Sequence, residues 1–487
     1  MKVVGHIIFR VSRNADSDRE EEDVEDLLAM IEEELRQRRF AEIVRLEVGH
    51  CTDPWLRNFL ATELGLKEED LFSLPQEFDL TDFALLAQSL PWDHHRFTSW
   101  SPVVPSALSD ITATVFDAIR KHDILLHHPF ESFSASVERF IREASIDSNV
   151  LAIKMTLYRT GDNSPFIKAL IEAAELGKQV VCLIELKARF DEERNIYWAQ
   201  ELENAGVHVV YGIVGFKTHA KTALVVRKEF DRVRCYAHLG TGNYNSVTSR
   251  FYTDLGLLTC DERITGELVE FFNYLTGKSL KQDYKHLIFA PLNMFNKFKE
   301  LIQRERDHAK LGNPSLIIAK FNNMEENDLS LALYEASQNK VPIHLIVRGF
   351  CCIKPHIKGV SETLTVRSTL GRFLEHSRIF YFRNGKENPL DGDFFLGSAD
   401  WMYRNLHGRV EAISPIYDRV AKEKLWSILQ LYLNDTKQTW IMRADGTYDK
   451  KHKNTETQSN GVQNDLMKSV LAQQHVTEDD LVKEERE

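Results

Sequence analysis

The feature that most constrains the fold of this chain is an internal repeat of alternating strand and helix patterns. In the first copy, the apolar runs 149–157 and 179–186 flank a helical pattern that begins at Ser164-Pro165, an N-cap and first-turn pair. In the second copy, the segment 332–348 (ALYEASQNKVPIHLIVR) echoes 169–186 (ALIEAAELGKQVVCLIEL). Because such alternation places helices on the faces of a mostly parallel sheet, the sequence predicts two related α/β domains.

A pair of short motifs recurs at matched spacing within the two copies. Residues 219–221 (His-Ala-Lys) precede 240–243 (Gly-Thr-Gly-Asn), and residues 376–378 (His-Ser-Arg) precede 397–400 (Gly-Ser-Ala-Asp). In both copies the first glycine follows the histidine by 21 residues, and the final Asn or Asp follows it by 24. A lone histidine before an apolar strand is usually a capping residue, but the matched spacing indicates two half-sites of one active site.

These residue types suit phosphoryl transfer. A neutral imidazole can attack phosphorus and hold the group as a phosphoramidate, while a second imidazole moves the proton of the leaving oxygen. An adjacent cation neutralises the transferred charge, and small turn residues let backbone N–H groups approach phosphate oxygens. The repeat therefore predicts His219 and His376 as the catalytic pair, with Lys221, Arg378 and Asn243 as phosphate contacts.

Composition indicates the class of protein and the cellular compartment. The chain has 487 residues, and its six cysteines show no metal-ligand spacing, which is typical of a reducing compartment. The longest apolar runs are strand-length, far below the ~20 residues that span a bilayer. We therefore expect a cytoplasmic protein with no membrane span. The net charge of −12 argues against a nucleic-acid partner, yet seven cations face only two acids between Arg348 and Arg383, where a polyanion could bind.

Changes of pattern along the chain predict its domain organisation. An acidic amphipathic helix is predicted over 20–39, and the prolines of 91–106 indicate a linker. The expected parts are a partial α/β head domain, two repeated catalytic domains and a polar, disordered tail with a short helix near 463–473; their ranges are 1–105, 106–286, 287–448 and 449–487.

Longer stretches carry a family resemblance. The twice-repeated H-x-K … G-x-x-N arrangement resembles the phospholipase D superfamily, but the acid that usually follows H-x-K is absent, since Lys221 precedes TALVV. LAIKMTLYRTGDNSP, ELKARFDEERNI, KTHAK, HLGTGNYN, FLEHSRIFYF and GSADWM together resemble polyphosphate kinases of the phospholipase-D-like type, over about residues 8–448. The resemblance implies two phospholipase-D-like domains after a partial head domain.

The resemblance also implies an activity: reversible transfer of the ATP γ-phosphate to inorganic polyphosphate through a phosphohistidine, with Mg²⁺ as cofactor. ATP, ADP and polyphosphate are then the expected partners. Because a guanidinium cannot ligate magnesium, two arginines that the family places near the metal are interpreted as clamps on phosphate oxygens. The implied roles are the phosphorylated histidine for His219, acid/base work for His376, ATP contacts for Tyr252 and Arg348, and the metal and phosphate vicinity for Arg159 and Arg189.

The same sequence departs from the family pattern at its N-terminus and leaves two alternative functions open. The chain begins inside the family's head domain, and the preceding domain of the family helps to hold adenine and supports dimer contacts, so we expect a homo-oligomer once that region is restored. A phospholipase-D-like hydrolase or phosphatidyl transferase would turn over phosphodiesters without ATP. A non-catalytic scaffold would bind polyphosphate without transferring phosphate.

Overall fold

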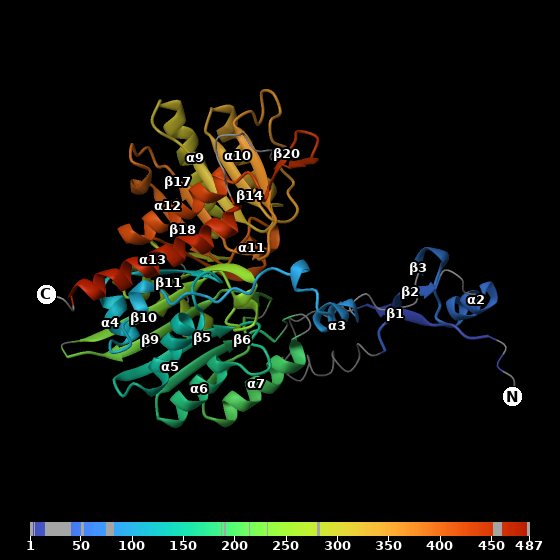
Figure 1. Ribbon diagram of the computed structural model, residues 1–487, viewed down its shortest axis with the longest axis horizontal. Coiled ribbons are helices and arrows are strands. Elements are labelled where there is room, and N and C mark those ends of the chain that lie inside the picture. The colour runs from blue at the N-terminus through green and yellow to red at the C-terminus, as the bar shows by residue number, and fades with distance from the viewer. Residues whose placement is uncertain are drawn as a thin grey trace. The chain divides into compact units, whose positions relative to one another are not determined.

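The computed structural model describes the chain as two compact units, Met1–Trp100 and Ser101–Glu487. Its described residues exclude 1–2, 4, 15–39, 50–52, 75–81, 187, 189–190, 214, 231, 280–282, 451–459 and 485–487. The helix predicted over 20–39 therefore lies outside the described residues. The α/β class predicted from the sequence is confirmed, with helices and strands alternating along both repeated halves of the second unit (Figure 1).

The first unit is a small α/β structure on a three-stranded sheet. Its strand order is β1-β2-β3, with β1 antiparallel and β3 parallel to the central strand. Helix α2 begins where it does because the Asp53 side chain accepts the backbone N–H of Trp55 and Pro54 occupies the first turn. The elements are β1 (Phe9–Arg13), β2 (Ile43–Gly49), α2 (Pro54–Glu63), β3 (Leu71–Leu74) and α3 (Asp82–Ser89).

The second unit contains an eight-stranded sheet built mainly from the first repeat, in the order β16-β11-β10-β9-β5-β6-β7 with β4 beside β11. Only β5, β6 and β7 form the predicted parallel βαβ run. The strands are β4 (Ile124–His128), β5 (Val150–Leu157), β6 (Gln179–Ile184), β7 (His208–Val210), β9 (Thr222–Lys228), β10 (Val233–Gly240), β11 (Tyr252–Thr259) and β16 (Leu374–Glu375); the helices are α4 (Val115–Lys121), α5 (Arg139–Ile146), α6 (Pro165–Glu175), α7 (Glu192–Asn204) and α8 (Glu262–Leu275).

The prediction of a mostly parallel sheet is therefore wrong for this half. Strands β9, β10, β11 and β4 pair antiparallel. The link from β9 to β10 is too short for a crossover helix, and strands joined by such a link run antiparallel. The predicted start of the helix is confirmed: Ser164 caps α6 by accepting the Ile167 N–H, and Pro165 lies in the first turn.

The second repeat forms a ten-stranded sheet, ordered β12-β19-β18-β17-β13-β14-β15-β20-β21 with β8 beside β19. Its βαβ core repeats that of the first half, since β13, β14 and β15 are parallel and β17 joins antiparallel. The strands are β8 (Lys217–Thr218), β12 (Ile288–Ala290), β13 (Ile317–Phe321), β14 (Ile343–Val347), β15 (Leu364–Thr369), β17 (Ile379–Phe382), β18 (Asp393–Gly397), β19 (Arg409–Pro415), β20 (Thr439–Met442) and β21 (Tyr448–Lys450); the helices are α9 (Met294–Lys310), α10 (Asn327–Gln338), α11 (Tyr403–His407) and α12 (Arg419–Asn434).

The two halves exchange short strands. β8 belongs to the first repeat but pairs in parallel with β19 of the second sheet. β16 belongs to the second repeat but pairs in parallel with β11 of the first sheet. Each exchanged strand ends immediately before a motif histidine, so the exchange brings both histidines to the junction of the two sheets.

The segment predicted as a polar, disordered tail contains a longer helix than expected. Helix α13 (Val462–Glu484) follows the second sheet. Val462, Leu466 and Val470 recur at every fourth position and are buried, so they form an apolar stripe. The stripe is narrow and lies among polar residues, which is why the composition of this stretch pointed to disorder.

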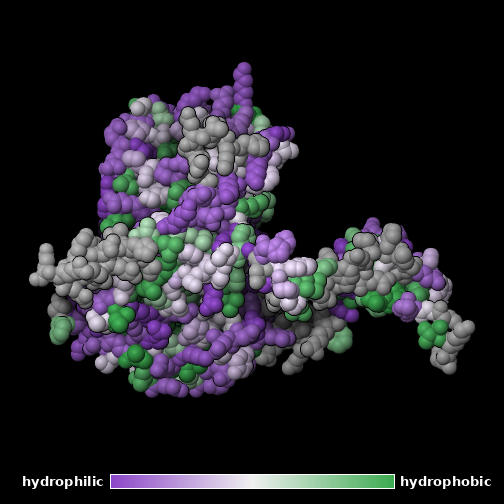
Figure 2. Space-filling model, in the orientation of Figure 1, coloured by the Kyte–Doolittle hydropathy of each residue, from purple (hydrophilic) through white to green (hydrophobic). Residues whose placement is uncertain are grey.

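The face of the molecule drawn in Figure 2 is largely hydrophilic. On the face drawn in Figure 2, hydrophobic residues of the second unit lie in separate patches among hydrophilic ones. Among the described residues, no helix combines the length and the apolar character that a membrane crossing requires.

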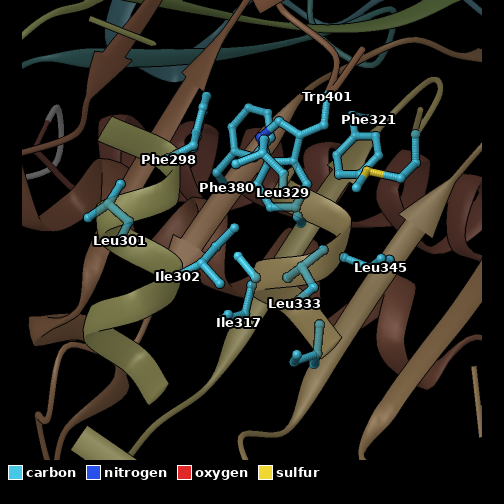
Figure 3. Packing of buried hydrophobic residues seen from close by; sticks show 14 of the residues in the cluster. Phe298, Leu301, Ile302, Ile317, Phe321, Leu329, Leu333, Leu345, Phe380 and Trp401 are labelled. Atoms are coloured by element: carbon cyan, nitrogen blue, oxygen red, sulfur yellow. The ribbon is translucent and has the colours of Figure 1, made fainter. Parts of the chain in front are cut away.

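The core of the second sheet centres on Trp401, which is fully buried (Figure 3). Its ring packs against Phe298 of α9, Phe321 of β13 and Phe380 of β17, with ring centroids 5.0–5.5 Å apart. Leu329 and Leu333 of α10 close the same cluster. One aromatic side chain thus joins α9 to β13 and to β17, the strand that directly follows the His376 motif.

We predict that Trp401→Ala lowers the free energy of unfolding by about 3–5 kcal/mol, because it leaves a cavity that the surrounding rings cannot fill. Urea denaturation would measure the change. Leu331→Ala is the control, because Leu331 is 59% exposed and its truncation should change the free energy by no more than about 0.5 kcal/mol. Equal effects of the two variants would contradict this account of the core.

Candidate active site

The two motif histidines are each anchored to a strand of the opposite half. His219 follows β8, and its backbone N–H donates to the Val410 carbonyl of β19 at 2.8 Å. His376 follows β16, and its backbone N–H donates to the Thr253 hydroxyl of β11 at 3.2 Å. The exchanged strands therefore set the position of both imidazoles.

Each imidazole also bonds a carboxylate from the opposite half. Nδ1 of His219 lies 2.8 Å from Oε1 and 2.9 Å from Oε2 of Glu411. Nδ1 of His376 lies 2.8 Å from Oδ1 of Asp254. Glu411 is fully buried and Asp254 nearly so. The two half-sites are thus crossed: neither histidine has its carboxylate within its own repeat.

The sequence interpretation missed these two carboxylates, although the repeat contains a signal for them. Asp254 follows His219 by 35 residues, and Glu411 follows His376 by the same number. Each carboxylate also accepts a hydroxyl hydrogen bond from the preceding turn: Thr241 donates to Asp254 at 2.6 Å, and Ser398 donates to Glu411. The repeat therefore extends beyond the Asn or Asp at which the motif was taken to end.

Burial keeps both imidazoles neutral near pH 7. It lowers the pKa of His219 well below its ordinary 6.5, and the nearby charges of Lys221, Arg409 and Arg378 lower it further. Burial also lowers the pKa of His376, against the opposing effect of Asp254. A neutral imidazole whose Nδ1–H donates to a carboxylate has its lone pair on Nε2. The site thus holds two oriented imidazoles whose lone pairs lie on Nε2, and the Nε2 of His376 faces Nη1 of Arg378 at 3.2 Å.

The two motif cations, Lys221 and Arg378, differ in the protein groups that they contact. Lys221 is 2% exposed, and its ammonium donates to the His219 carbonyl. Arg378 is as deeply buried and makes three contacts with protein oxygens: Thr241 O at 3.0 Å, His376 O at 3.0 Å and Asp400 Oδ1 at 3.1 Å. The second half therefore neutralises its cation with Asp400, whereas the first half has the uncharged Asn243 at the equivalent position.

Tyr158 is a further residue beside the nucleophile candidate that sequence reasoning did not single out. Its ring meets the His219 imidazole edge-on, with centroids 5.2 Å apart and planes at 87°. Arg159, Lys217 and Lys221 all place their cationic groups 5.3–5.6 Å from the same ring. One aromatic face thus gathers three positive charges next to His219.

Two predicted ATP contacts lie beside His376. The Tyr252 ring is 5.3 Å from the His376 ring. Arg348, just past the end of β14, donates from Nη1 to the carbonyl of Glu375 at 2.9 Å. Burial lowers the pKa of Arg348, and Asp400 and Tyr252 oppose this shift. These side chains come from both sheets, so only the folded chain brings them together.

The small residues of the two turns serve close packing. A Cβ on Gly242 would lie 2.4 Å from the Asp254 carboxylate, and one on Gly397 would lie 2.1 Å from the Ala412 carbonyl. The N–H group that follows the first glycine of each turn is already used, because Thr241 donates to Leu255 O and Ser398 donates to Ala412 O. The expected role of these N–H groups in phosphate binding is therefore wrong for Thr241 and Ser398. Asn243 differs, since its Oδ1 is buried with no described hydrogen-bond partner.

The two arginines expected near a metal are placed unequally. Arg159 pairs with Asp191 at 3.1 Å and adjoins the Tyr158 ring. Arg189 lies outside the described residues. Magnesium prefers oxygen ligands, commonly one or two carboxylates together with substrate phosphates. The described residues contain no cluster of three or more His, Cys, Asp or Glu side chains that could hold a metal ion. They therefore do not form a cage for a resident magnesium ion.

Two α/β domains that each bring an H-x-cation motif and a G-x-x-N or G-x-x-D turn to one junction define a phospholipase-D-like protein. Comparisons with known families place the chain more closely. Residues 1–86 match the polyphosphate kinase middle domain, 114–281 match its C-terminal domain 1, and 287–463 match its C-terminal domain 2. The chain belongs to the polyphosphate kinase family.

Individual relatives agree with this assignment. The polyphosphate kinase of Synechocystis sp. is 48% identical over 472 residues, covering 94% of this chain and 64% of the relative. That of Prochlorococcus marinus is 45% identical over 482 residues, covering 96% and 67%. The crystal structure of polyphosphate kinase from Porphyromonas gingivalis superposes with a TM-score of 0.79 at 29% identity, covering 89% of this chain and 65% of that one. The chain thus spans 64% of the length of the first of these relatives.

The buried imidazoles predict a pH dependence of stability. Because the pKa of His219 is lower in the folded chain than its ordinary 6.5, the unfolded chain binds more protons below that pH. The free energy of unfolding should therefore fall as the pH drops below 6.5, by up to about 1.4 kcal/mol per pH unit for each such histidine. His219→Gln should flatten this slope in denaturation series, whereas exposed His94→Gln should leave it unchanged. A slope unaltered in His219→Gln would show that His219 is not held neutral.

Proposed function

We propose that this chain carries the catalytic site of a polyphosphate kinase, which transfers the γ-phosphate of ATP reversibly to inorganic polyphosphate through a phosphohistidine at His219. The observation that carries the proposal is the crossed pair of buried, neutral imidazoles, each fixed at Nδ1 by a carboxylate of the other half. Membership of the polyphosphate kinase family supports the substrate pair, because the relatives carry that name.

In the first step, the Nε2 lone pair of His219 attacks the γ-phosphorus of ATP. An N–P bond forms, the bond from that phosphorus to the bridging oxygen breaks, and its electron pair leaves with ADP. The Nδ1 proton stays between His219 and Glu411, so the imidazolium charge that develops is stabilised in place. His376, held by Asp254, acts first as a base: its Nε2 takes a proton from a protonated phosphate oxygen of the bound substrate and then passes that proton to the leaving oxygen.

In the second step, a terminal oxygen of the polyphosphate chain attacks the phosphorus on His219. The N–P bond breaks and its electron pair returns to Nε2. Run backwards, the same two steps make ATP from ADP and polyphosphate. Each phosphorus passes through a transition state whose charge lies on its outer oxygens, so positive side chains around the group are the principal means of stabilisation.

The cations and polar groups of the site fit that demand. Lys221 lies beside His219 and has no carboxylate at the position of Asn243, so it is suited to the transferred phosphoryl group. The buried Oδ1 of Asn243 is suited to accept a hydrogen bond from the ligand, for example from a protonated phosphate oxygen. Further contacts are proposed for Arg378 with the phosphates, Tyr252 and Arg348 with ATP, and Arg159 and Arg189 with phosphate oxygens near the metal.

A divalent cation, Mg²⁺, would reach this site on the nucleotide phosphates and would neutralise part of their charge. Arg159 would act as a clamp on the same oxygens, because a guanidinium offers only donors. Assembly into oligomers and a cytoplasmic location remain predictions of the sequence.

We predict that incubation with γ-labelled ATP and Mg²⁺ puts acid-labile, base-stable label on the chain, and that His219→Ala abolishes it. The reason is that the Nε2 of His376, the other imidazole with a carboxylate behind Nδ1, already lies 3.2 Å from Nη1 of Arg378, which leaves His219 as the nucleophile. The control is exposed His94→Ala, which should label like the parent. Label persisting in His219→Ala would refute the assigned nucleophile.

Two other outcomes separate the alternatives. Turnover of a lipid or nucleic-acid phosphodiester without ATP would identify a phospholipase-D-like hydrolase or transferase. Binding of polyphosphate by the folded chain with no label on the parent would indicate a scaffold, or a catalytic half that needs the remainder of a longer protein.

A further inference from the structure

We propose that Gln463, in the first turn of the C-terminal helix α13, is a positioning residue for His376. It would hold the two-residue strand β16, from which His376 projects into the junction of the sheets. The kinetic consequence of this inference rests on the proposed function, but the structural part does not. The helix lies beyond the predicted end of the second catalytic domain at residue 448.

The strand that leads to His376 is too short to fix itself. β16 comprises only Leu374 and Glu375, which pair with Tyr252 and Thr253 at the edge of the first sheet. So few ladder positions give little resistance to fraying, and a displacement of β16 would carry His376 away from Asp254. The position of this imidazole therefore depends on contacts outside the ladder.

Gln463 provides such contacts with its whole side chain, which is completely buried. Its Nε2 donates to the Phe373 carbonyl at 2.9 Å and to Glu375 Oε1 at 2.7 Å. Its Oε1 accepts the Phe373 N–H at 3.0 Å. The amide thus bonds the residue before β16 in both directions and also bonds the last residue of that strand. Its own N–H donates to Gln438 Oε1 at 3.2 Å, which fixes the start of the helix.

Glu375 passes this restraint to His376. Its other oxygen, Oε2, accepts from Tyr432 at 2.6 Å, from Lys320 at 2.9 Å and from Thr253 at 3.0 Å. The same Thr253 hydroxyl accepts the backbone N–H of His376. A buried carboxylate with donors on both oxygens is held firmly, so Gln463, Glu375 and Thr253 form a continuous set of bonds to the catalytic backbone.

The loop before β16 is shaped to receive this amide. A Cβ on Gly371 would lie 2.3 Å from Gln463 Oε1 and 2.5 Å from Gln438 Nε2, so the loop can approach this closely only with glycine at that position. Gly461 precedes the helix with φ +97°, and a Cβ there would lie 2.7 Å from Gln438 Oε1. Both glycines remove side chains that would push α13 off the loop.

The first half holds its equivalent strand without the tail. The N–H of Thr218, next to His219, donates to Glu185 Oε2 at 2.6 Å, and Glu185 belongs to the same repeat. The restraint from α13 is therefore specific to His376. Removal of the hydrogen bonds of Gln463 should therefore change the position of His376 and leave that of His219 unchanged.

The test uses Gln463→Met in the full chain, which keeps the side-chain volume and removes the hydrogen bonds. Leu466→Ala is the control, since Leu466 is buried on the same helix but bonds nothing near His376. We expect kcat for phosphoryl transfer to fall about 10–100-fold in Gln463→Met with the KM for ATP little changed, because misplacing a reacting group by about 1 Å costs that much. Leu466→Ala should lower the melting temperature without that loss of kcat. Gln463→Asn, which keeps the amide but is too short to reach both partners, replaces the Met variant if that variant does not fold.

A second measurement does not depend on activity. The ring signal of His376 in ¹³C-histidine-labelled protein, assigned by its loss in His376→Ala, should shift or broaden in Gln463→Met and not in Leu466→Ala. An unchanged signal, or a kcat equal to that of Leu466→Ala in an active parent, would overturn the inference. A parent without transfer activity whose His376 signal still responds to Gln463→Met would refute the proposed function and leave the positioning role supported.

Discussion

The structure of the second unit depends on a reciprocal exchange between its two halves, in which each repeat supplies a histidine to the other repeat's carboxylate. The bonds from His219 to Glu411 and from His376 to Asp254 are buried, and both are backed by the exchanged strands β8 and β16. Removing either carboxylate would leave a polar ring in a buried site without its acceptor. The same contacts that hold the halves together therefore also set the tautomers on which chemistry at Nε2 depends.

The site is symmetric in its bonds and asymmetric in its charge. Arg378 pairs with Asp400, but the equivalent of that carboxylate in the first half is the uncharged Asn243, so Lys221 has no carboxylate at that position. Burial lowers the pKa of Lys221 well below its ordinary value, against the attraction of Glu411. An anionic phosphoryl group would restore the favourable surroundings of that ammonium. For the proposed phosphohistidine, this difference is a physical reason to place the phosphoryl group on the half that contains His219.

Several elements followed directly from local sequence signals. Ser164-Pro165 marked the start of α6, and the alternating apolar and helical patterns marked β5, β6 and α7. The antiparallel pairing of β9 to β11 was missed because strand direction depends on connections and not on apolar runs. Helix α13 was predicted only as a short helix near 463–473, because three buried residues spaced by four are a weak signal in a polar stretch. Gln463 carries no signal of its own, since a buried amide and an exposed one look alike in a sequence.

The sequence by itself determined the α/β class, the twofold repeat, the two histidines and the family, because each of these is written in residue types at fixed spacing. It also contained Asp254 and Glu411 at a matched distance from the histidines, but no local rule could say that each would serve the other half. Only the tertiary structure decided that each histidine pairs with the carboxylate of the other half, that Gln463 packs against β16, and that both imidazoles are neutral. The physical reason is that strand exchange and burial are properties of packing between segments 88 to 192 residues apart, where neither periodicity nor capping carries information.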